Sequence, residues 1–253
     1  MNEFAREKVV IGNWKMNKTI ADAVTFISGL TPYVKNLKGK VGLAVPFTAL
    51  AFASQAAKGS PIAIGAQNVS QADEGAVTGE ISCNMIKDAG AVFALVGHSE
   101  RRRLFHEDDT IVNHKVVRLL GAGLQPVVCI GETLVQRESG QTHEVLHKHL
   151  VDSLRGLTPE QVERCMIAYE PVWAIGTSKA ASSLDVQETH AYCRSLIGKL
   201  WGEAAASKIH ILYGGSVTAS NAGELLGQKD VDGLLVGGAS LSLETFSEIV
   251  RKI

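Results

Sequence analysis

The stretch Val92-Phe93-Ala94-Leu95-Val96 is an uninterrupted apolar run that ends in Gly97-His98-Ser99-Glu100. Val127-Val128-Cys129-Ile130 has the same character. Strands that are apolar on both faces are typical of a parallel sheet that helices cover on both sides. The pattern therefore predicts buried parallel strands, with polar residues where at least one of them ends.

Comparable runs recur along the chain, beginning near Val9, Val41, Ile62, Val92, Pro126, Met166, Ile209 and Gly233. Each precedes an amphipathic or Ala- and Leu-rich stretch, and these stretches predict helices at Asp22–Leu30, Leu50–Ala57, Cys83–Ala89, Asp108–Leu120, Leu134–Leu154, Asp185–Leu200, Asn221–Leu226 and Leu243–Val250. Several have Asp, Ser or Asn near their start, which are preferred N-cap residues. No linker or composition shift divides the chain. We expect an α/β protein, a single-domain (β/α)8 barrel over residues 1–253 with eight parallel strands and an outer ring of helices.

The composition points to a small-molecule partner. The 253 residues carry a formal net charge of -1, and the longest basic run is Arg101-Arg102-Arg103, which disfavours a nucleic-acid surface. Residues 1–8 lack the apolar core of a signal peptide, and no apolar run approaches the roughly 18 residues of a membrane span. The four cysteines are far apart, as expected of reduced thiols. We expect a cytoplasmic protein without nucleic-acid or membrane partners.

In such a barrel, chemistry belongs on the loops that follow the strands. Met166-Ile167-Ala168-Tyr169 reads as a strand, and Glu170 follows it directly. Pro171 favours an extended Glu170, whereas Gly176 and the small residues after it allow the next segment to move. The pattern favours a general base beneath a lid over a solvated glutamate at a strand end.

Two further polar residues follow predicted strands. Lys15 comes after the first strand together with Asn13, which favours a placed cation over an ordinary surface lysine. His98 closes a fully apolar run, where a core histidine is the alternative. Its position at a strand end of a barrel favours catalysis.

Glycine pairs follow the last two predicted strands, as Gly214-Gly215-Ser216 and Gly237-Gly238. Bare backbone can approach a phosphate closely and donate N–H groups to it, although glycine pairs also occur in ordinary turns. Their position favours a phosphate site. The chain lacks G-x-G-x-x-G and G-x-x-x-x-G-K-[ST], so the phosphate is expected to belong to the substrate.

His143-Glu144-Val145-Leu146-His147 matches the H-E-x-x-H zinc motif. The extended motif fails, because Leu150 and Ser153 stand where it needs Gly and His; Glu160 or Glu163 could in principle supply a third ligand. We expect this helix to lie in the outer ring, with a solvated face made of Gln141, His143, Glu144, His147, Lys148 and His149. We therefore predict no metal site.

Taken together, the clusters resemble the triosephosphate isomerase family along nearly the whole chain. The matching fragments are Ile11-Gly12-Asn13-Trp14-Lys15-Met16-Asn17, Gly65-Ala66-Gln67-Asn68, Thr78-Gly79-Glu80, Gly97-His98-Ser99-Glu100-Arg101-Arg102, Cys129-Ile130-Gly131-Glu132-Thr133, the segment after Glu170, Tyr213-Gly214-Gly215-Ser216-Val217 and Val236-Gly237-Gly238-Ala239-Ser240-Leu241. Their shared order and spacing are highly specific.

The resemblance implies a TIM barrel that interconverts dihydroxyacetone phosphate and D-glyceraldehyde 3-phosphate through an enediolate, in glycolysis and gluconeogenesis, without metal or organic cofactor. It assigns Glu170 as the base and neutral His98 as the electrophile. Lys15 and Asn13 would bind the substrate and stabilise negative charge. The remaining implied roles are phosphate binding by backbone groups of Gly176, Ser216, Gly237 and Gly238, and support of Lys15 by Glu100.

The resemblance also implies a homodimer in which Thr78 of one subunit lies near Asn13 and Lys15 of the other. Residues 67–82 form a long loop with polar tips, which suits docking. Two residues depart from the family's pattern: Ser178 replaces a glycine in the lid, and Val77 replaces an aromatic residue in the interface loop. Lid opening and dimer strength are therefore left open.

Three alternatives remain at this point. They are another phosphate-binding barrel enzyme, such as a sugar-phosphate epimerase or a lyase of the tryptophan pathway, a zinc peptidase that uses His143 and His147, and a non-catalytic phosphate-binding protein. The joint presence of Lys15, His98 and Glu170 on the first, fourth and sixth strands favours the isomerase over all three.

Overall fold

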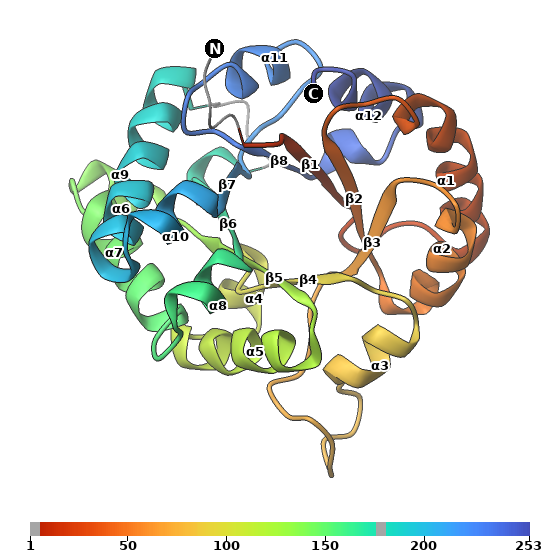
Figure 1. Ribbon diagram of the computed structural model, residues 1–253, viewed down its shortest axis with the longest axis horizontal. Helices are drawn as coiled ribbons and strands as arrows, with labels where there is room; N and C mark the ends of the chain where they lie inside the picture. The colour runs from red at the N-terminus through yellow and green to blue at the C-terminus, as the bar shows by residue number, and fades with distance from the viewer. Residues whose placement is uncertain (1–5, 176–180) are drawn as a thin grey trace.

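A computed structural model describes residues 6–175 and 181–253. Eight parallel strands form a closed barrel in sequence order, and the last strand pairs with the first (Figure 1). The strands are β1 (Val9–Asn13), β2 (Lys40–Val45), β3 (Ile62–Ala66), β4 (Phe93–Val96), β5 (Gln125–Ile130), β6 (Met166–Tyr169), β7 (His210–Tyr213) and β8 (Gly233–Val236). Every strand begins within one residue of the position predicted from the sequence.

The strands are apolar on both faces because each face borders a separate core. One cluster fills the barrel interior and includes Ile11, Phe93, Leu95 and Leu235. A larger cluster lies between the strands and the helices and includes Val10. This double burial explains why the strands read as continuous apolar runs in the sequence.

Helices surround the barrel (Figure 1). They are α1 (Ile20–Val34), α2 (Leu50–Ala57), α3 (Cys83–Asp88), α4 (Ser99–Leu104), α5 (Asp109–Ala122), α6 (Leu134–Glu138), α7 (Thr142–Ser153), α8 (Pro159–Glu163), α9 (Ser183–Trp201), α10 (Glu203–Lys208), α11 (Ala222–Leu226) and α12 (Leu243–Val250), with 3-10 turns η1 (Phe47–Ala49), η2 (Val172–Ala174) and η3 (Gly238–Ser240). None of these helices combines the length and apolar character needed to cross a membrane.

The predicted helix Leu134–Leu154 is wrong as a single element. The structure divides it into α6 and α7, and Gly140 between them has a φ of 71°. That left-handed conformation is open to glycine and breaks the helical path. The short helices α4, α8 and α10 have no counterpart among the predicted helices, because five or six residues carry only a weak periodic signal.

Capping residues fix where several helices begin. Asp108 accepts the N–H of Ile111 at the start of α5, at 2.8 Å. Ser182 forms a reciprocal capping box with Asp185 at the start of α9. These contacts agree with the Asp and Ser residues recognised near predicted helix starts.

The long connection between β3 and α3 projects from the body of the barrel (Figure 1). Thr78 and Val77 are exposed in it, Val77 by 44%. Its base is tied back by the N–H of Ser70, which donates to the carbonyl of Ile81 at 2.8 Å. In the single chain, this loop is therefore anchored at its base and exposed to solvent at its tip.

Candidate active site

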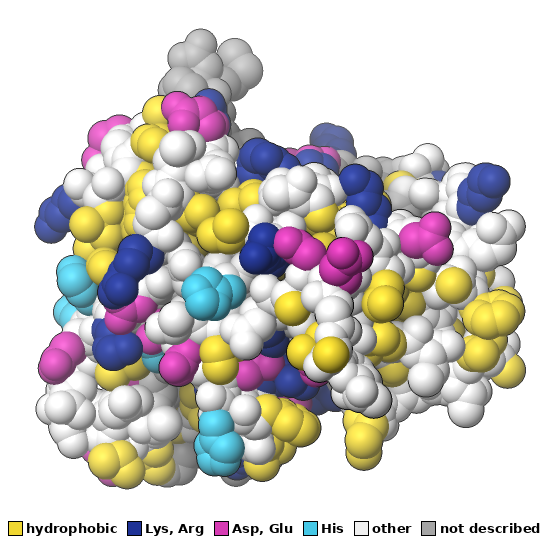
Figure 2. Space-filling view, turned by 90° about the horizontal axis from the view of Figure 1, so that it is seen from below, with side chains coloured by type: hydrophobic (Ala, Val, Ile, Leu, Met, Phe, Trp, Pro, Cys, Tyr) yellow, Lys and Arg dark blue, Asp and Glu magenta, His cyan; other side chains and the backbone are white. Residues whose placement is uncertain are grey.

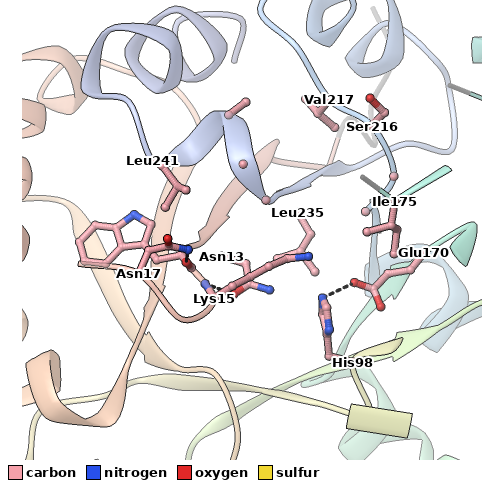
Figure 3. A pocket seen from close by; sticks show the side chains of 16 residues that line it. Asn13, Lys15, Asn17, His98, Glu170, Ile175, Ser216, Val217, Leu235 and Leu241 are labelled. Carbon is pink, nitrogen blue, oxygen red and sulfur yellow. Dashed lines mark hydrogen bonds and ion pairs between the residues drawn. The ribbon is translucent and has the colours of Figure 1, made fainter. Parts of the chain in front are cut away.

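The predicted catalytic side chains meet at one end of the barrel. Asn13 is the last residue of β1, Lys15 follows it, His98 follows β4 and Glu170 follows β6. Because all strands are parallel, their carboxyl ends share one mouth. There the four residues line a pocket of about 420 Å³ together with Gly214, Gly215, Ser216, Gly237 and Gly238 (Figure 3).

Glu170 is buried and directly contacts His98. Its Oε1 lies 2.9 Å from Nε2 of His98 (Figure 3). Its Oε2 accepts the N–H of Ser99 at 3.0 Å. The Glu170 backbone is held as well, because its N–H donates to the carbonyl of Ile130 at 2.7 Å. A Cβ on Gly214 would lie 2.9 Å from Cγ of Glu170, so only glycine leaves room for this side chain.

His98 also caps α4. Its Nδ1 accepts the N–H of Glu100 at 3.2 Å, so the neutral ring carries its proton on Nε2 and donates it toward Glu170. The site therefore presents one N–H donor, at His98 Nε2, beside one carboxylate oxygen.

The two groups shift each other's titration. Burial opposes a charge on His98, but the adjacent Glu170 carboxylate outweighs it and raises the pKa of His98. Burial likewise opposes a charge on Glu170, but His98 and the N–H of Ser99 lower the pKa of Glu170 below its usual value. The resting site holds an ionised carboxylate at neutral pH.

Lys15 occupies a left-handed backbone conformation, with a φ of 53°. Its N–H donates to Oδ1 of Asn13 at 3.0 Å, and its carbonyl accepts from Gln67 at 2.9 Å. A non-glycine residue held in this region is typical of functional sites. Its ammonium Nζ lies 2.5 Å from Oε1 of Glu100, which places Glu100 beside Lys15 as the resemblance implied.

Part of the pocket wall is glycine-rich and consists largely of backbone. Ser216 follows β7, and its carbonyl accepts from Asn221 at 3.1 Å, which holds this loop. Gly237 follows β8 and leads into η3, where Ser240 donates to its carbonyl at 2.7 Å. These glycine-rich segments line the same pocket as Glu170.

The predicted supporting residues Glu100 and Thr78 do not line this pocket. Thr78 lies exposed on the loop after β3 and does not line it. Gly176, like Ser178 of the predicted lid, lies outside the described residues.

Sequence reasoning did not single out three supporting groups. They are the N–H of Ser99, the amide of Gln67 and the carboxylate of Glu132. Glu132 is fully buried and accepts from Tyr169 at 3.1 Å and from the indole of Trp173 at 2.9 Å. The sequence signal that could have identified Glu132 is its place in Gly131-Glu132-Thr133, directly after a buried strand.

The H-E-x-x-H motif is part of α7 in the outer ring. His143 and His147 are exposed, and the ring of His143 stacks on Tyr192 with centroids 3.9 Å apart. In the part of the chain that the structure describes, no group of three His, Cys, Asp or Glu side chains is placed to hold a metal ion. The prediction of a solvated His149 is wrong, because this side chain turns inward and its Nδ1 accepts the N–H of Gly131.

Fold and site together define a (β/α)8-barrel enzyme of acid–base type. A carboxylate, an imidazole and an ammonium group converge on a pocket with a glycine-rich backbone wall. Such a pocket suits proton transfer within a small anionic substrate.

Comparison with known proteins gives the family. The sequence model of the family described as triosephosphate isomerase matches residues 8–253. The chain is 50% identical to the triosephosphate isomerase of Protochlamydia amoebophila, covering 99% of this chain and 95% of the relative, and 49% identical to that of Chlamydia trachomatis serovar D, covering 98% and 90%. A crystal structure of triosephosphate isomerase from Bartonella henselae is similar at 39% identity with a TM-score of 0.88, covering 97% of this chain and 98% of that one.

The chain belongs to the triosephosphate isomerase family. It is an isomerase that interconverts dihydroxyacetone phosphate and D-glyceraldehyde 3-phosphate. The fold class and the reaction predicted from the sequence are confirmed.

Proposed function

We propose that Glu170 is the base of this isomerisation and that His98 is its electrophile. The observation that carries the proposal is the 2.9 Å contact between His98 Nε2 and Glu170 Oε1 in a pocket that Lys15 also enters (Figure 3). A substrate carbonyl group that enters between them meets an N–H donor at its oxygen and a carboxylate at the neighbouring carbon.

The reaction begins with the transfer of a proton from substrate carbon to Glu170. A Glu170 oxygen takes a proton from the carbon beside the carbonyl group, the electron pair of that C–H bond forms a C=C double bond, and the π pair of the C=O bond moves to the carbonyl oxygen. His98 and the Lys15 ammonium stabilise the resulting enediolate as preorganised donors. His98 exchanges protons with the two substrate oxygens, so that the former carbonyl oxygen gains a proton and the former hydroxyl oxygen loses one. Glu170 returns its proton to the former carbonyl carbon, which completes the exchange between ketose and aldose.

The resting contact also tunes the base. His98 now lowers the pKa of Glu170, whereas burial by itself would raise it. When His98 turns its N–H to the substrate, the Glu170 carboxylate loses a hydrogen-bond partner, so its pKa rises and it becomes a stronger base.

We propose that backbone groups of Ser216, Gly237 and Gly238 bind the substrate phosphate, because these glycine-rich segments line the same pocket as the acid–base pair. On the family resemblance we add Gly176 to this set. Asn13 is proposed to act with Lys15, whose backbone it orients through a hydrogen bond of 3.0 Å.

We propose a homodimer in which Thr78 of one subunit approaches Asn13 and Lys15 of the other. A second hollow beside the site supports this proposal. Asn13, Lys15 and His98 line it together with four exposed apolar residues, Met16, Phe47, Leu104 and Phe105. A loop tip carrying Val77 and Thr78 suits an apolar hollow of this kind. The face from which the loop projects carries scattered apolar side chains, and its basic and acidic side chains are interspersed (Figure 2).

We further propose that residues 1–253 are one catalytic domain located in the cytoplasm. The closed barrel uses strands from both ends of the chain, since β8 pairs with β1. The four cysteines are buried free thiols, which fits a reducing compartment.

The central experiment is an isomerase assay after exhaustive chelation. We expect full turnover of glyceraldehyde 3-phosphate without added metal, because acid, base and anion-binding groups are all in the protein. A matched variant, His143→Asn with His147→Asn, removes the zinc motif and should keep full activity. The proposal would be contradicted if the wild-type enzyme required zinc for activity and the double variant were inactive.

A further inference from the structure

His149 on α7 lies behind the active site, although the sequence places it among solvated residues. Its Nδ1 lies 3.3 Å from the backbone nitrogen of Gly131 and accepts the proton of that N–H. Gly131 follows β5 directly, so the contact joins an outer helix to a strand end at the barrel mouth.

The Gly131 peptide touches the backbone of Glu170. A Cβ on Gly131 would lie 1.7 Å from the Glu170 carbonyl oxygen, so these two backbones are in direct contact. The preceding residue, Ile130, accepts the Glu170 N–H at 2.7 Å. A shift of the Gly131 peptide is therefore transmitted to Glu170.

Packing alone does not hold this peptide. A cavity of about 320 Å³ borders it, lined by Gly131, His149, Glu170, Ser99 and Arg102 among others. Open volume on one side lets a peptide move, so a directional hydrogen bond is what limits the movement.

We propose that His149 is a positioning residue for the catalytic base: by accepting the Gly131 N–H it fixes the peptide against which Glu170 rests. This inference rests on the proposed role of Glu170 and extends it to a side chain of the outer helical ring.

The surroundings keep His149 in the form that accepts. Arg102 from α4, Asp109 from α5, and Lys148 and Asp152 from α7 are the charged groups that act on it. Burial and then the Arg102 guanidinium lower the pKa of His149 to about 4. Nδ1 therefore keeps its lone pair at neutral pH, and the proton is on Nε2.

The Arg102 side chain is itself held in place by hydrogen bonds and an ion pair. It donates to the carbonyls of Gly97 at 2.7 Å and Cys129 at 3.2 Å, and it pairs with Asp109 at 2.6 Å. The charge that keeps His149 neutral thus has a defined position.

The test compares His149→Leu with His149→Asn. Leucine is of similar size but cannot accept a hydrogen bond, whereas Oδ1 of asparagine takes the place of Nδ1. Since a displacement of 1 Å can cost on the order of 100-fold in rate, we expect His149→Leu to lower kcat roughly 10-fold with KM nearly unchanged. His149→Asn should recover most of kcat. His147→Leu, at an exposed position of the same helix, is the matched control and should retain wild-type kcat.

Equal kcat in wild type and His149→Leu, or equal losses in the leucine and asparagine variants, would overturn the proposal. If His149→Leu does not fold, the wild-type protein provides the test through the ¹⁵N–¹⁵N coupling across the hydrogen bond from Gly131 to His149 Nδ1. Its absence overturns the proposal too.

A double-variant cycle separates this inference from the proposed function. If His149 acts through Glu170, the rate losses of His149→Leu and Glu170→Asp should combine to less than their product. Full additivity refutes the positioning role, whereas a Glu170→Asp variant with wild-type kcat refutes the base itself.

Discussion

At the scale of single residues, the contacts of Glu170 are the basis of its proposed role as the base. Its two carboxylate oxygens face different partners, Nε2 of His98 and the N–H of Ser99. Ser99 orients the carboxylate, while His98 occupies the place where a substrate would enter. The carboxylate is therefore anchored on one side and exchangeable on the other.

Shortening Glu170 tests its role as base. Glu170→Asp keeps the charge but retracts the carboxylate by about 1 Å, which should lower kcat on the order of 100-fold. KM should change little, because the backbone groups proposed to bind phosphate are unaltered. Steady-state kinetics measure both, and binding of a phosphate-bearing transition-state analogue is the control for an intact pocket. Nearly wild-type kcat in a folded variant would show that another group is the base.

Replacing His98 tests the coupling of the pair. In His98→Asn the side-chain oxygen can still cap α4, but it does not extend to Glu170. Removal of His98 leaves burial to act, so the pKa of Glu170 should rise. The acid limb of kcat/KM against pH, which reports the free enzyme, should therefore move to higher pH, with a large loss of kcat. An acid limb that stays in place would argue that His98 does not lower the pKa of Glu170.

At the scale of elements, the ends of β5 and β6 form one unit around Glu132. Its carboxylate accepts from Tyr169 on β6 and from Trp173 in η2, and its carbonyl accepts the N–H of Val172 at 3.0 Å. Arg137 of α6 lies 3.6 Å away. This buried anchor ties the segment that follows Glu170 to the neighbouring strand.

Removing this anchor should cost stability. In Glu132→Leu the buried hydroxyl of Tyr169 loses its acceptor, and we expect a loss of about 2–3 kcal/mol in the free energy of unfolding. Urea denaturation measures the loss. The double variant Glu132→Leu with Tyr169→Phe is the control. It should recover part of the lost stability, because it also removes the Tyr169 hydroxyl that has lost its acceptor. Unchanged stability in Glu132→Leu would contradict an anchoring role.

At the scale of the whole molecule, closure of the barrel brings together residues from β1, β4 and β6. The proposed dimer would extend the same principle to a second chain.

Association is tested at the loop tip. Val77→Glu should weaken the dimer, because a charge would enter the apolar hollow of the partner, and activity should fall at nanomolar protein concentration. Sedimentation measures association. Leu200→Glu on α9 is the matched control, since Leu200 is as exposed as Val77, 44%, but distant from the loop. A fully active wild-type monomer at nanomolar concentration would rule out the proposed sharing of the site.

Stability should decline in mild acid. Burial lowers the pKa of both His149 and His190 to about 4, against 6.5 when unfolded. The contribution of each histidine to the free energy of unfolding is fully present above pH 6.5 and is lost as pH falls toward 4. The loss is up to about 3 kcal/mol for each histidine. His210, with a lowered pKa, acts in the same direction, and His98, with a raised pKa, acts in the opposite one.

The urea midpoint between pH 7.5 and 4.5 measures this effect. His190→Asn, whose amide can still donate to the carbonyl of Asp230, should flatten the profile. A wild-type midpoint that is constant over this range would contradict the assignment of neutral buried histidines.

The sequence by itself determined the barrel and the identity of its polar strand ends. Eight apolar runs are readable because strands buried on both faces must be continuously apolar, and Glu170, His98 and Lys15 stand out because each interrupts that pattern where a strand ends. Local signals such as Asp108 likewise set a helix start, since a cap depends only on the next three residues.

Only the tertiary structure decided distances and partners between distant segments. The 2.9 Å contact of His98 with Glu170, the burial of Glu132 and the inward turn of His149 each join residues from different strands or layers. No periodicity encodes such contacts, because they depend on how the barrel closes. His149 has the sequence pattern of a solvated outer-helix residue, and only the packed fold shows that it reaches the strand end beside the proposed base, Glu170.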